Sequence, residues 1–496
     1  MVKQHLDCDW LLSDPGSTPA QAGRRITLED GRIVAVDVTQ RSPTASRRLV
    51  LPALANAHDH ARTFRSATLG SYGKPLETWL PYLGVTPAAD PYLGAVTSFS
   101  RSARRGVSHL MVHYTRVQGG LPYVDEVEAV ARAARDVGIN IGFAVSIRDQ
   151  QGIAYCADST VLSTVRADIR DEVAQRLSAP ATTPAEQLAR VDEIAQMLAA
   201  GNYGSHVTLQ YGPNGVQWCS RPLLEAIAKA SADTGRPVHM HLLETKYQRA
   251  WMDAQYPQGV VAYLDEIGLL SPRLTLAHCV WARPDELALL AERGVIIAVN
   301  TSSNLGIRSG IAPVPEMLRQ GCRVAMGMDG LALDEDDDAL REMRLAFSLH
   351  RGWGYDEQMS RAQLWQFAAR NGRQSVAGAQ PSEGARITVG EPADLLVLDW
   401  DAVDDDALFP DVDPLELLLA RAHGGHIQEV YIGGRQIVAK GKVITVDEEG
   451  MRAELIAQVR SRLRDNPAAA RWRDVLDVLS EDLGPFYSKG VYLGCC

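Results

Sequence analysis

Short apolar runs alternate with amphipathic segments through the middle of the chain. Runs rich in Val, Ile and Leu predict eight β-strands, at 49–57, 107–113, 139–146, 206–211, 237–242, 273–278, 295–300 and 322–328. Helical periodicity occupies the segments between them, for example at 124–137, 221–234 and 284–293. Strands that alternate with helices in this way predict parallel strands joined by crossover helices.

The number of strands favours a closed α/β barrel. Eight strands within about 280 residues fit a (β/α)8 TIM barrel better than an open doubly wound sheet. No G-x-G-x-x-G follows the first strand, which removes the main reason to expect a dinucleotide-binding fold. At 221–234, Ser220 is a suitable N-cap and Gly235 a suitable residue to end the helix.

The two flanks of this region share a different pattern. Residues 25–36 predict short strands joined by a turn at Asp30-Gly31, and 385–389, 393–398 and 430–435 repeat that pattern. Neither flank can bury a core alone. We therefore expect residues 1–50 and 385–445 to form one small composite β-sandwich beside a barrel of residues 51–384.

Two further segments lie outside that scheme. Residues 446–496 predict a C-terminal helical extension, helical over 448–483 and packed on the outside, followed by a tail. The connection at 149–184 is longer than usual and is a candidate lid, although the pattern alone does not establish that role.

Composition narrows the class of protein. Of the 496 residues, 46% are hydrophobic, which is typical of a soluble globular enzyme, and the net charge of −11 argues against a nucleic-acid or anionic-membrane partner. No signal peptide and no apolar stretch of about 20 residues is evident. Seven cysteines without a C-x-x-C pair predict reduced thiols in a cytoplasmic protein, and the terminal Cys495-Cys496 pair lacks a prenylation motif.

The candidate chemistry lies where predicted strands end. In His58-Asp59-His60, residues two apart on a strand face the same side, so both imidazoles point into the barrel mouth. His241, His278 and Asp329 end the fifth, sixth and eighth strands. Any one of these could be a hydrogen-bonded core residue or a cap. Their shared position at carboxyl strand ends, where barrels build active sites, instead predicts a metal site.

These motifs resemble the amidohydrolase superfamily, in particular its branch of cytosine, adenosylhomocysteine and guanine deaminases and triazine hydrolases. The resemblance covers residues 7–445. It rests on Leu-Pro-Ala-Leu-Ala-Asn-Ala-His-Asp-His at 51–60, Val-His-Met-His-Leu-Leu-Glu-Thr at 238–245, Leu-Ala-His-Cys at 276–279, Gly-Met-Asp-Gly at 327–330 and the flank at 390–397.

The resemblance implies a set of roles. His58, His60, His241 and Asp329 would hold one divalent metal, with Zn²⁺ preferred and Fe²⁺ or Mn²⁺ as alternatives. Glu244 would shuttle a proton, His278 would polarise the water or the substrate, and Asp329 would also act as a base. Neither the third nor the fourth strand contains a lysine that could bridge a second metal. His239 is the competing ligand, but the H-x-x-E register selects His241.

The substrate is less well defined. Gly212-Pro-Asn214-Gly-Val replaces the Pro-His-Ala segment of many deaminases, which argues against adenosine-type substrates and favours the triazine-hydrolase pattern. Candidate substrate-binding residues are Arg62, Arg65, His113, Asn214 and Ser303, which stand in loops after strands.

Other features near these loops allow two interpretations. The two arginines and Arg116 could recognise a carbonyl or carboxylate or could simply be surface residues. Trp79 could stack on the substrate or could be an aromatic residue of the core, and the sequence favours neither. The acidic run at 331–338 predicts a solvated face with helix N-terminal charge.

The sequence thus predicts a metal-dependent aminohydrolase of a small nitrogen heterocycle such as a purine, pyrimidine, pterin or triazine. The alternatives are hydrolysis of a cyclic amide or another leaving group, and a non-catalytic barrel scaffold, which the complete ligand set disfavours. The expected partners are a small-molecule substrate and, by analogy with relatives, a second copy of the chain.

Overall fold

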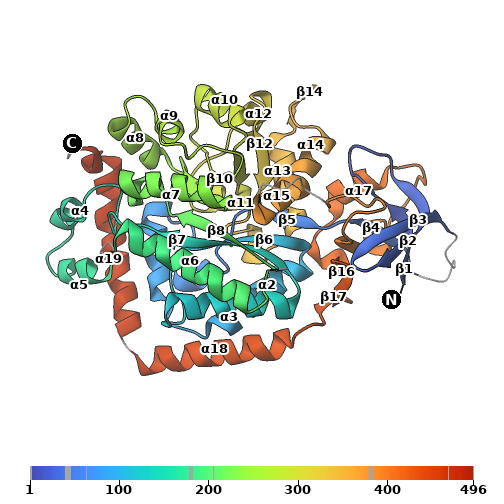
Figure 1. Ribbon diagram of the computed structural model, residues 1–496, viewed down its shortest axis with the longest axis horizontal. Helices are drawn as coiled ribbons and strands as arrows, with labels where there is room; N and C mark the ends of the chain where they lie inside the picture. The colour runs from blue at the N-terminus through green and yellow to red at the C-terminus, as the bar shows by residue number, and fades with distance from the viewer. Residues whose placement is uncertain are drawn as a thin grey trace.

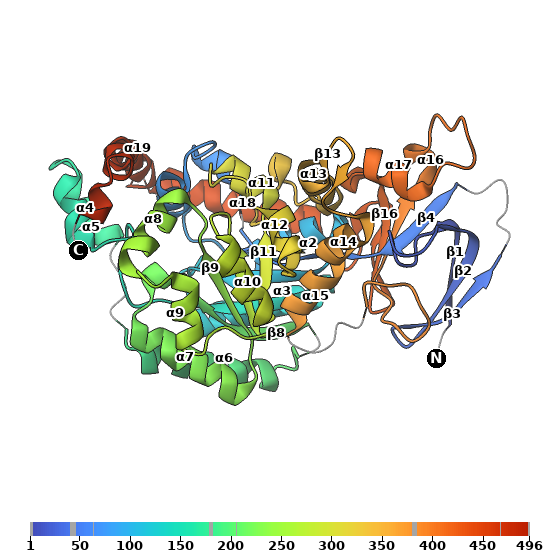
Figure 2. The same cartoon turned by 90° about the horizontal axis from the view of Figure 1, so that it is seen from above.

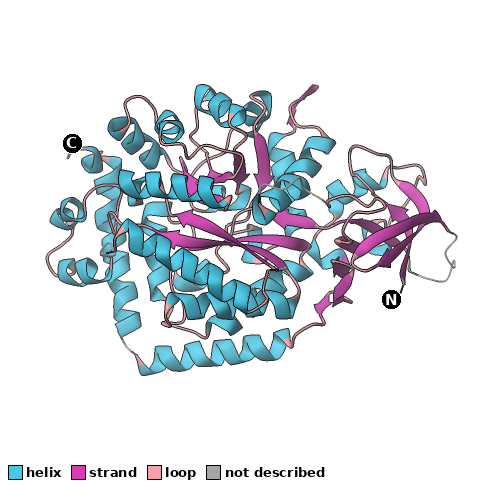
Figure 3. Ribbon diagram, in the orientation of Figure 1, coloured by secondary structure: helices cyan, strands magenta, loops and turns pink. Residues whose placement is uncertain are grey.

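The computed structural model describes residues 3–39, 46–62, 64–177, 182–204, 206–378, 384–466 and 468–494. Eight parallel strands form one sheet in the order β12-β11-β10-β9-β8-β7-β6-β5 (Figures 1 and 3). The amide of Ala57, just after β5, donates to the carbonyl of Met326 in β12 at 2.7 Å, which brings the two ends of the sheet together. The predicted (β/α)8 barrel is confirmed. Its strands are β5 (Leu54–Asn56), β6 (Val107–Tyr114), β7 (Asn140–Ile147), β8 (Val207–Pro213), β9 (Val238–Leu242), β10 (Leu274–His278), β11 (Ile296–Val299) and β12 (Arg323–Met326).

Helices connect these strands and cover the barrel. In α7 (Arg221–Thr234), the Ser220 side chain accepts a hydrogen bond from the amide of Leu223, and Gly235 has a φ of 71°, as its predicted caps require. The buried face of α7 includes Leu223, Leu224 and Ile227. Other connecting helices are α2 (Pro91–Arg104), α3 (Tyr123–Val137), α6 (Pro184–Ala200), α8 (Lys246–Gln255), α9 (Val260–Glu266), α10 (Pro284–Glu292), α12 (Val314–Arg319), α13 (Ala339–His350) and α15 (Asn371–Ala377).

Both ends of the chain build a second sheet beside the barrel (Figure 2). Asp30 and Gly31 have φ angles of 49° and 80°, as a two-residue hairpin turn of this type needs. The amide of Ile33 donates to the carbonyl of Glu391 at 2.9 Å, so the edge strand lies against the segment that leads into β15. The strand order is β18 (Lys442–Val443), β17 (Arg435–Ala439), β16 (Ile427–Ile432), β15 (Leu395–Asp399), β4 (Arg48–Pro52), β1 (Gln4–Leu11), β2 (Gln21–Glu29) and β3 (Arg32–Val38).

Two strand predictions are wrong in detail. The run 49–57 is two strands: β4 pairs with β15 in the terminal sheet, and β5 pairs with β6 in the barrel. The chain changes sheets at Ala53, and because both sheets bury it, the apolar run continues across the change. Residues 385–389 are not a strand in the structure. The residue limits proposed for the domains stay predictions.

The C-terminal segment is helical and lies on the outside, as expected, but it forms two helices. These are α18 (Glu448–Asp465) and α19 (Ala468–Ser488) (Figure 1). Helix α19 contacts η2 (Leu80–Val85), and the Tyr82 hydroxyl donates to Asp477. None of the described helices combines the length and apolar character needed to cross a bilayer. The described cysteines carry free thiols, and Cys495 and Cys496 lie outside the described residues.

Candidate active site

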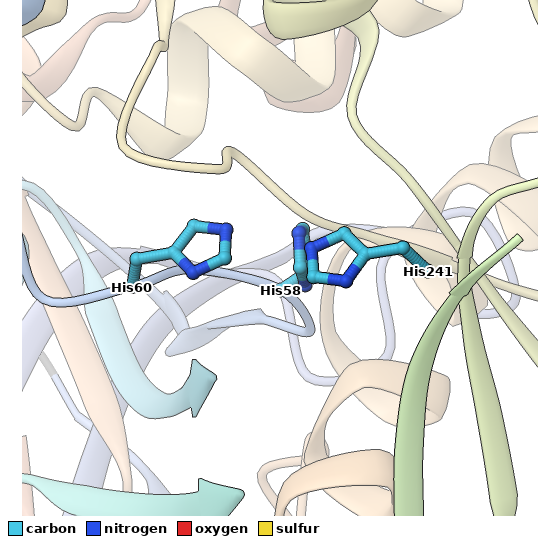
Figure 4. Close-up of side chains that lie close together, drawn as sticks. All are labelled: His58, His60 and His241. Carbon is cyan, nitrogen blue, oxygen red and sulfur yellow. The ribbon is translucent and has the colours of Figure 1, made fainter. Parts of the chain in front are cut away.

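Three histidines from two strand ends converge at the mouth of the barrel. Figure 4 shows the rings of His58, His60 and His241 close together. The His58 ring centroid lies 4.9 Å from that of His60 and 4.8 Å from that of His241. One ligand atom from each of these three histidines lies within 4.8 Å of the others, and the same holds for His58, His278 and Asp329. The residues predicted as ligands are therefore close enough to share one ion.

Backbone carbonyls fix the orientation of two of the rings. His60 Nδ1 lies 2.6 Å from the carbonyl oxygen of His113, and His241 Nδ1 lies 2.7 Å from that of Asn214. A carbonyl oxygen can only accept, so in both rings Nδ1 carries the proton. Nε2 is then left with a free lone pair, which is the arrangement that metal-binding histidines adopt.

The remaining donors fit a divalent cation as well. Both ring nitrogens of His58 are buried and have no hydrogen-bond partner among the described residues, an unusual state for a buried polar group. Burial lowers the pKa of His58 and His241 well below 6.5, so both are neutral, the form that binds metal. Asp329 Oδ1 lies 2.9 Å from His60 Nε2 and 3.6 Å from His58 Nε2. Neutral imidazoles with one carboxylate suit zinc.

His239 has a different role from His241. Its Nε2 lies 3.1 Å from the carbonyl oxygen of Ala57, so this nitrogen donates to the backbone. Its ring stacks on His58 with centroids 4.9 Å apart and an interplanar angle of 11°. His239 therefore supports His58 by packing and does not belong to either three-residue group of close ligand atoms.

Glu244 and His278 face each other beside the histidine cluster. His278 Nε2 lies 3.7 Å from Glu244 Oε2, and His278 Nδ1 lies 2.9 Å from Asn304 Oδ1. Burial raises the pKa of Glu244 well above 4.5, and the negative charges of Asp329 and Glu77 raise it further. Burial also lowers the pKa of His278. The pair thus combines a carboxyl that holds its proton with a neutral imidazole.

A cavity of about 260 Å³ opens onto these groups. Of the residues predicted to bind substrate, Arg62 and Asn214 line it. Its wall also includes Trp79, and the Arg62 guanidinium carbon lies 4.9 Å from the centroid of this ring. Trp79 is therefore a buried aromatic that also forms part of the cavity wall. The cavity is also lined by Arg116, Arg148, Arg176, Trp218, Glu244 and Asp329.

The other three predicted substrate-binding residues lie elsewhere. His113 is fully buried, and its Nε2 lies 3.1 Å from the Gly212 carbonyl oxygen. Ser303 is buried and donates through Oγ to Asp329 Oδ2 at 2.6 Å. Arg65 is exposed, precedes the short helix η1 (Ser66–Leu69) and does not line the cavity. Arg62 and Arg65 follow the same strand, but only Arg62 points into the cavity.

Sequence reasoning missed Asp59, which connects two loops of the site. Its carboxylate accepts hydrogen bonds from the amides of His60 at 2.7 Å and Gly330 at 2.9 Å. The Nδ2 of Asn56 donates to it at 2.8 Å. Asp59 therefore holds the loop after β5 against the loop after β12. The sequence signal that could have identified Asp59 is its position between two histidines, directly after an apolar run.

The prediction that the acidic run at 331–338 forms a solvated face is wrong. Asp337 and Asp338 are each only 1% exposed, so they do not form a solvated face. Asp337 accepts from Arg101 Nε at 2.8 Å, and Asp338 caps α13 and accepts from the amide of Gly424. The expected helix N-terminal charge is confirmed at Asp338, but the run as a whole is largely structural.

Gly327 lies where no side chain fits. A Cβ there would stand 2.0 Å from Asn300 Oδ1 and 2.9 Å from His58 Cβ. Gly327→Ala is expected to displace His58 and to weaken metal affinity about 10- to 100-fold, as loss of a ligand's support does. Zinc titration with a competing chelator measures this. Gly306→Ala, whose Cβ would meet nothing within 4 Å, is the matched control; equal affinities in the two variants would contradict the prediction.

Glu342 on α13 provides a pH-dependent test. It accepts a hydrogen bond from the amide of Ser302 at 2.9 Å, and burial raises its pKa from 4.5 to about 7. The folded protein therefore binds this proton more tightly than the unfolded chain, and the contribution, up to about 3 kcal/mol, is lost as pH rises towards 7. Relative to the parent, Glu342→Gln should gain Tm from pH 4.5 to about 7 and show little further gain above that pH. Parallel Tm profiles would show that the carboxyl is already ionised.

Comparisons with known proteins show the family and the fold of the chain. The amidohydrolase family model matches residues 49–437. The 5-methylthioadenosine/S-adenosylhomocysteine deaminase of Moorella thermoacetica is 29% identical over 427 residues, which cover 84% of this chain and 87% of that protein. A zinc-bound adenosine deaminase from Xanthomonas campestris superposes with a TM-score of 0.73 at 22% identity, covering 93% of this chain and 98% of the other. A mutant atrazine chlorohydrolase from Arthrobacter aurescens, complexed with zinc and atraton, has a TM-score of 0.71 at 21% identity, covering 91% and 98%.

Proposed function

Because the chain belongs to the amidohydrolase family, a group of metal-dependent hydrolases of carbon–nitrogen bonds, we propose that it deaminates a small nitrogen heterocycle with His58, His60, His241 and Asp329 as the metal ligands. The observation that carries the proposal is the convergence of these donors beside the Glu244–His278 pair. The deaminase name of the Moorella relative supports the same reaction class. A structural metal would have closed coordination without an adjacent acid and base.

When bound at this donor set, a divalent metal lowers the pKa of water and so supplies a nucleophile near neutral pH. Asp329 is suited to accept a proton from the attacking water. Burial opposes its ionisation, but the positive charge of Arg62 nevertheless lowers its pKa below 3.8, so the carboxylate is ionised and can take up a proton. Ser303 holds its second oxygen in place. Asp329 would thus be both ligand and base.

The proton for the substrate would come from Glu244. Its raised pKa keeps the carboxyl protonated near neutral pH, so it can donate to a ring nitrogen and make the adjacent carbon more electrophilic. His278, with Nδ1 on Asn304, presents Nε2 to the site and can align the attacking water. Asp329 would then return its proton to the exocyclic nitrogen and Glu244 would take the proton of the new hydroxyl group, so that collapse of the tetrahedral intermediate expels ammonia.

One observation supports the alternative reaction, which is hydrolysis of a leaving group other than ammonia. Asn214 lines the cavity at the position where many deaminases have the histidine of a Pro-His-Ala segment. The atrazine chlorohydrolase superposes over nearly the whole fold, which is consistent with another leaving group at the same site. The cytoplasmic location and the homo-oligomeric state expected from the sequence stay predictions.

The test is an ammonia-release screen of the zinc-loaded protein with aminopurines, aminopyrimidines, pterins and aminotriazines. Release of ammonia from one class, and its loss after chelation and restoration by zinc, is the expected result. Turnover of a substrate without nitrogen release would replace deamination by the second reaction. Absence of hydrolysis throughout the screen would count against both.

A further inference from the structure

A buried carboxylate stands behind the wall of the cavity. Glu77 lies in the short helix α1 (Leu76–Trp79) and is only 7% exposed. Trp79 of the same helix lines the cavity, whereas Glu77 does not. Glu77 Oε1 accepts one hydrogen bond from the Thr245 hydroxyl at 2.6 Å and another from the Tyr155 hydroxyl at 2.7 Å. Burying a carboxylate is costly, yet neither the metal site nor the proposed proton transfers use this one.

The Thr245 hydroxyl connects this carboxylate to the segment that carries Glu244. Thr245 follows Glu244 directly and is the N-cap of α8, where its hydroxyl also accepts from the amide of Gln248 at 3.1 Å. Gln248 Oε1 in turn accepts from the amide of Glu244 at 2.7 Å. One short chain of hydrogen bonds therefore runs from Glu77 to the backbone of Glu244. The two carboxyl groups are also close enough for the negative charge of Glu77 to raise the pKa of Glu244.

The C-terminal segment fixes the other donor to Glu77. Tyr155 lies in the loop that follows β7 and is only 3% exposed. Its ring centroid lies 5.7 Å from that of Tyr487 on α19 and 6.4 Å from that of Tyr492 in η7 (Val491–Leu493). Aromatic rings at these distances pack against one another. Packing thus holds the Tyr155 hydroxyl in place, and Glu77 can act as a fixed point for the segment after β9.

We propose that Glu77 is a positioning residue for Glu244, which it holds through the Thr245 hydroxyl in the orientation needed for proton transfer to the substrate. This inference rests on the proposed function and adds a residue to its mechanism. A proton donor must lie within about 2.6–3.2 Å of its acceptor, so a donor on a loosened segment loses rate although its own chemistry is intact. Glu77 neither lines the cavity nor belongs to the two groups of close ligand atoms. The effect of its loss should therefore fall on kcat, with KM and zinc content preserved.

The test is a double-mutant cycle with the proton donor, measured by ammonia release from the best substrate of the screen. Glu77→Leu leaves the Thr245 hydroxyl without its acceptor and should lower kcat about 10- to 100-fold, with KM within about 3-fold of the parent and full zinc content. The same substitution in the Glu244→Gln background should lower kcat no further, because the donor that Glu77 positions is already absent. Glu77→Gln keeps an acceptor oxygen and should recover most of the lost rate.

A second pair of variants changes the other half of the hydrogen bond. Thr245→Val removes the hydroxyl and should reproduce the kcat loss, whereas Thr245→Ser keeps the hydroxyl and should recover most of the rate. If Glu77→Leu fails to fold, this pair and its cycle with Glu244→Gln decide the question.

Hydrogen–deuterium exchange of the zinc-loaded protein gives a readout that does not depend on turnover. The amide of Glu244 is hydrogen-bonded to Gln248, and that of Gln248 to Thr245. Exchange over residues 244–248 should be about 2- to 10-fold faster in Glu77→Leu than in the parent, as the loss of one supporting hydrogen bond allows.

Glu429→Leu is the matched control. Glu429 also accepts from a tyrosine hydroxyl, that of Tyr431 at 2.7 Å, but it lies in β16 of the terminal sheet. Its loss should change neither kcat nor the exchange over residues 244–248.

Three results would overturn the proposal: an equal kcat loss from Glu77→Leu in both backgrounds, a raised KM at unchanged kcat, or unchanged exchange over residues 244–248. The first of these would show a structural role alone. Faster exchange without ammonia release from the parent would overturn only the proposed deamination. Ammonia release with undiminished kcat in both Glu77→Leu and Thr245→Val would overturn only this inference.

Discussion

Replacement of Glu244 by glutamine is expected to lower kcat about 100- to 10,000-fold while the protein keeps its zinc. The amide has nearly the same shape as the carboxyl but cannot supply a proton to the substrate. Glu244 also lies outside the two groups of close ligand atoms, so metal binding should not depend on it. The measurement is kcat for the best substrate of the ammonia-release screen, together with the zinc content of the same preparation.

Glu266→Gln is the matched control for this variant. Glu266 lies on α9, is largely exposed and pairs with Arg221, so its replacement should leave both kcat and zinc content unchanged. Full activity of Glu244→Gln would refute the role of Glu244 as the proton donor. Loss of zinc in that variant would show instead that the carboxylate helps to hold the metal.

Replacement of His241 by asparagine should abolish both metal binding and turnover. Loss of a direct ligand should weaken zinc affinity by more than the roughly 10- to 100-fold that loss of a supporting hydrogen bond costs. Without the metal, the site has no means of generating a nucleophile from water at neutral pH. Zinc content after dialysis against buffered zinc, and ammonia release under the same conditions, measure the two effects.

His239→Asn distinguishes the two histidines of the same strand. His239 donates to the carbonyl of Ala57 and stacks on His58, so its loss should lower Tm but leave a zinc site that fills at higher zinc concentration. If His239→Asn lost the metal completely and His241→Asn retained it, the register assigned to the H-x-x-E motif would be wrong.

The convergence of the proposed metal ligands could be predicted from sequence because each residue belongs to a local pattern. The position of His58 and His60 after an apolar run, and of Asp329 after another, specifies carboxyl strand ends once the barrel is recognised. The limits of α7 were predictable for a similar reason, since Ser220 and Gly235 act within the helix they cap.

Features that depend on tertiary contacts were not predictable in this way. Arg62 and Arg65 have the same chemistry and differ only in which way a loop turns. Asp337 looks solvated in the sequence because its partner, Arg101, is far away along the chain. The support that Asn304 gives to His278 likewise joins α11 (Thr301–Gly306) to the end of β10.

The most direct measurement is diffraction from crystals of the zinc-loaded protein at wavelengths on either side of the zinc absorption edge. Our account predicts one anomalous peak per chain, at about 2.0–2.2 Å from the Nε2 atoms of His60 and His241, a ring nitrogen of His58 and a carboxylate oxygen of Asp329. A peak centred elsewhere, or two peaks bridged by a side chain, would contradict a single shared ion.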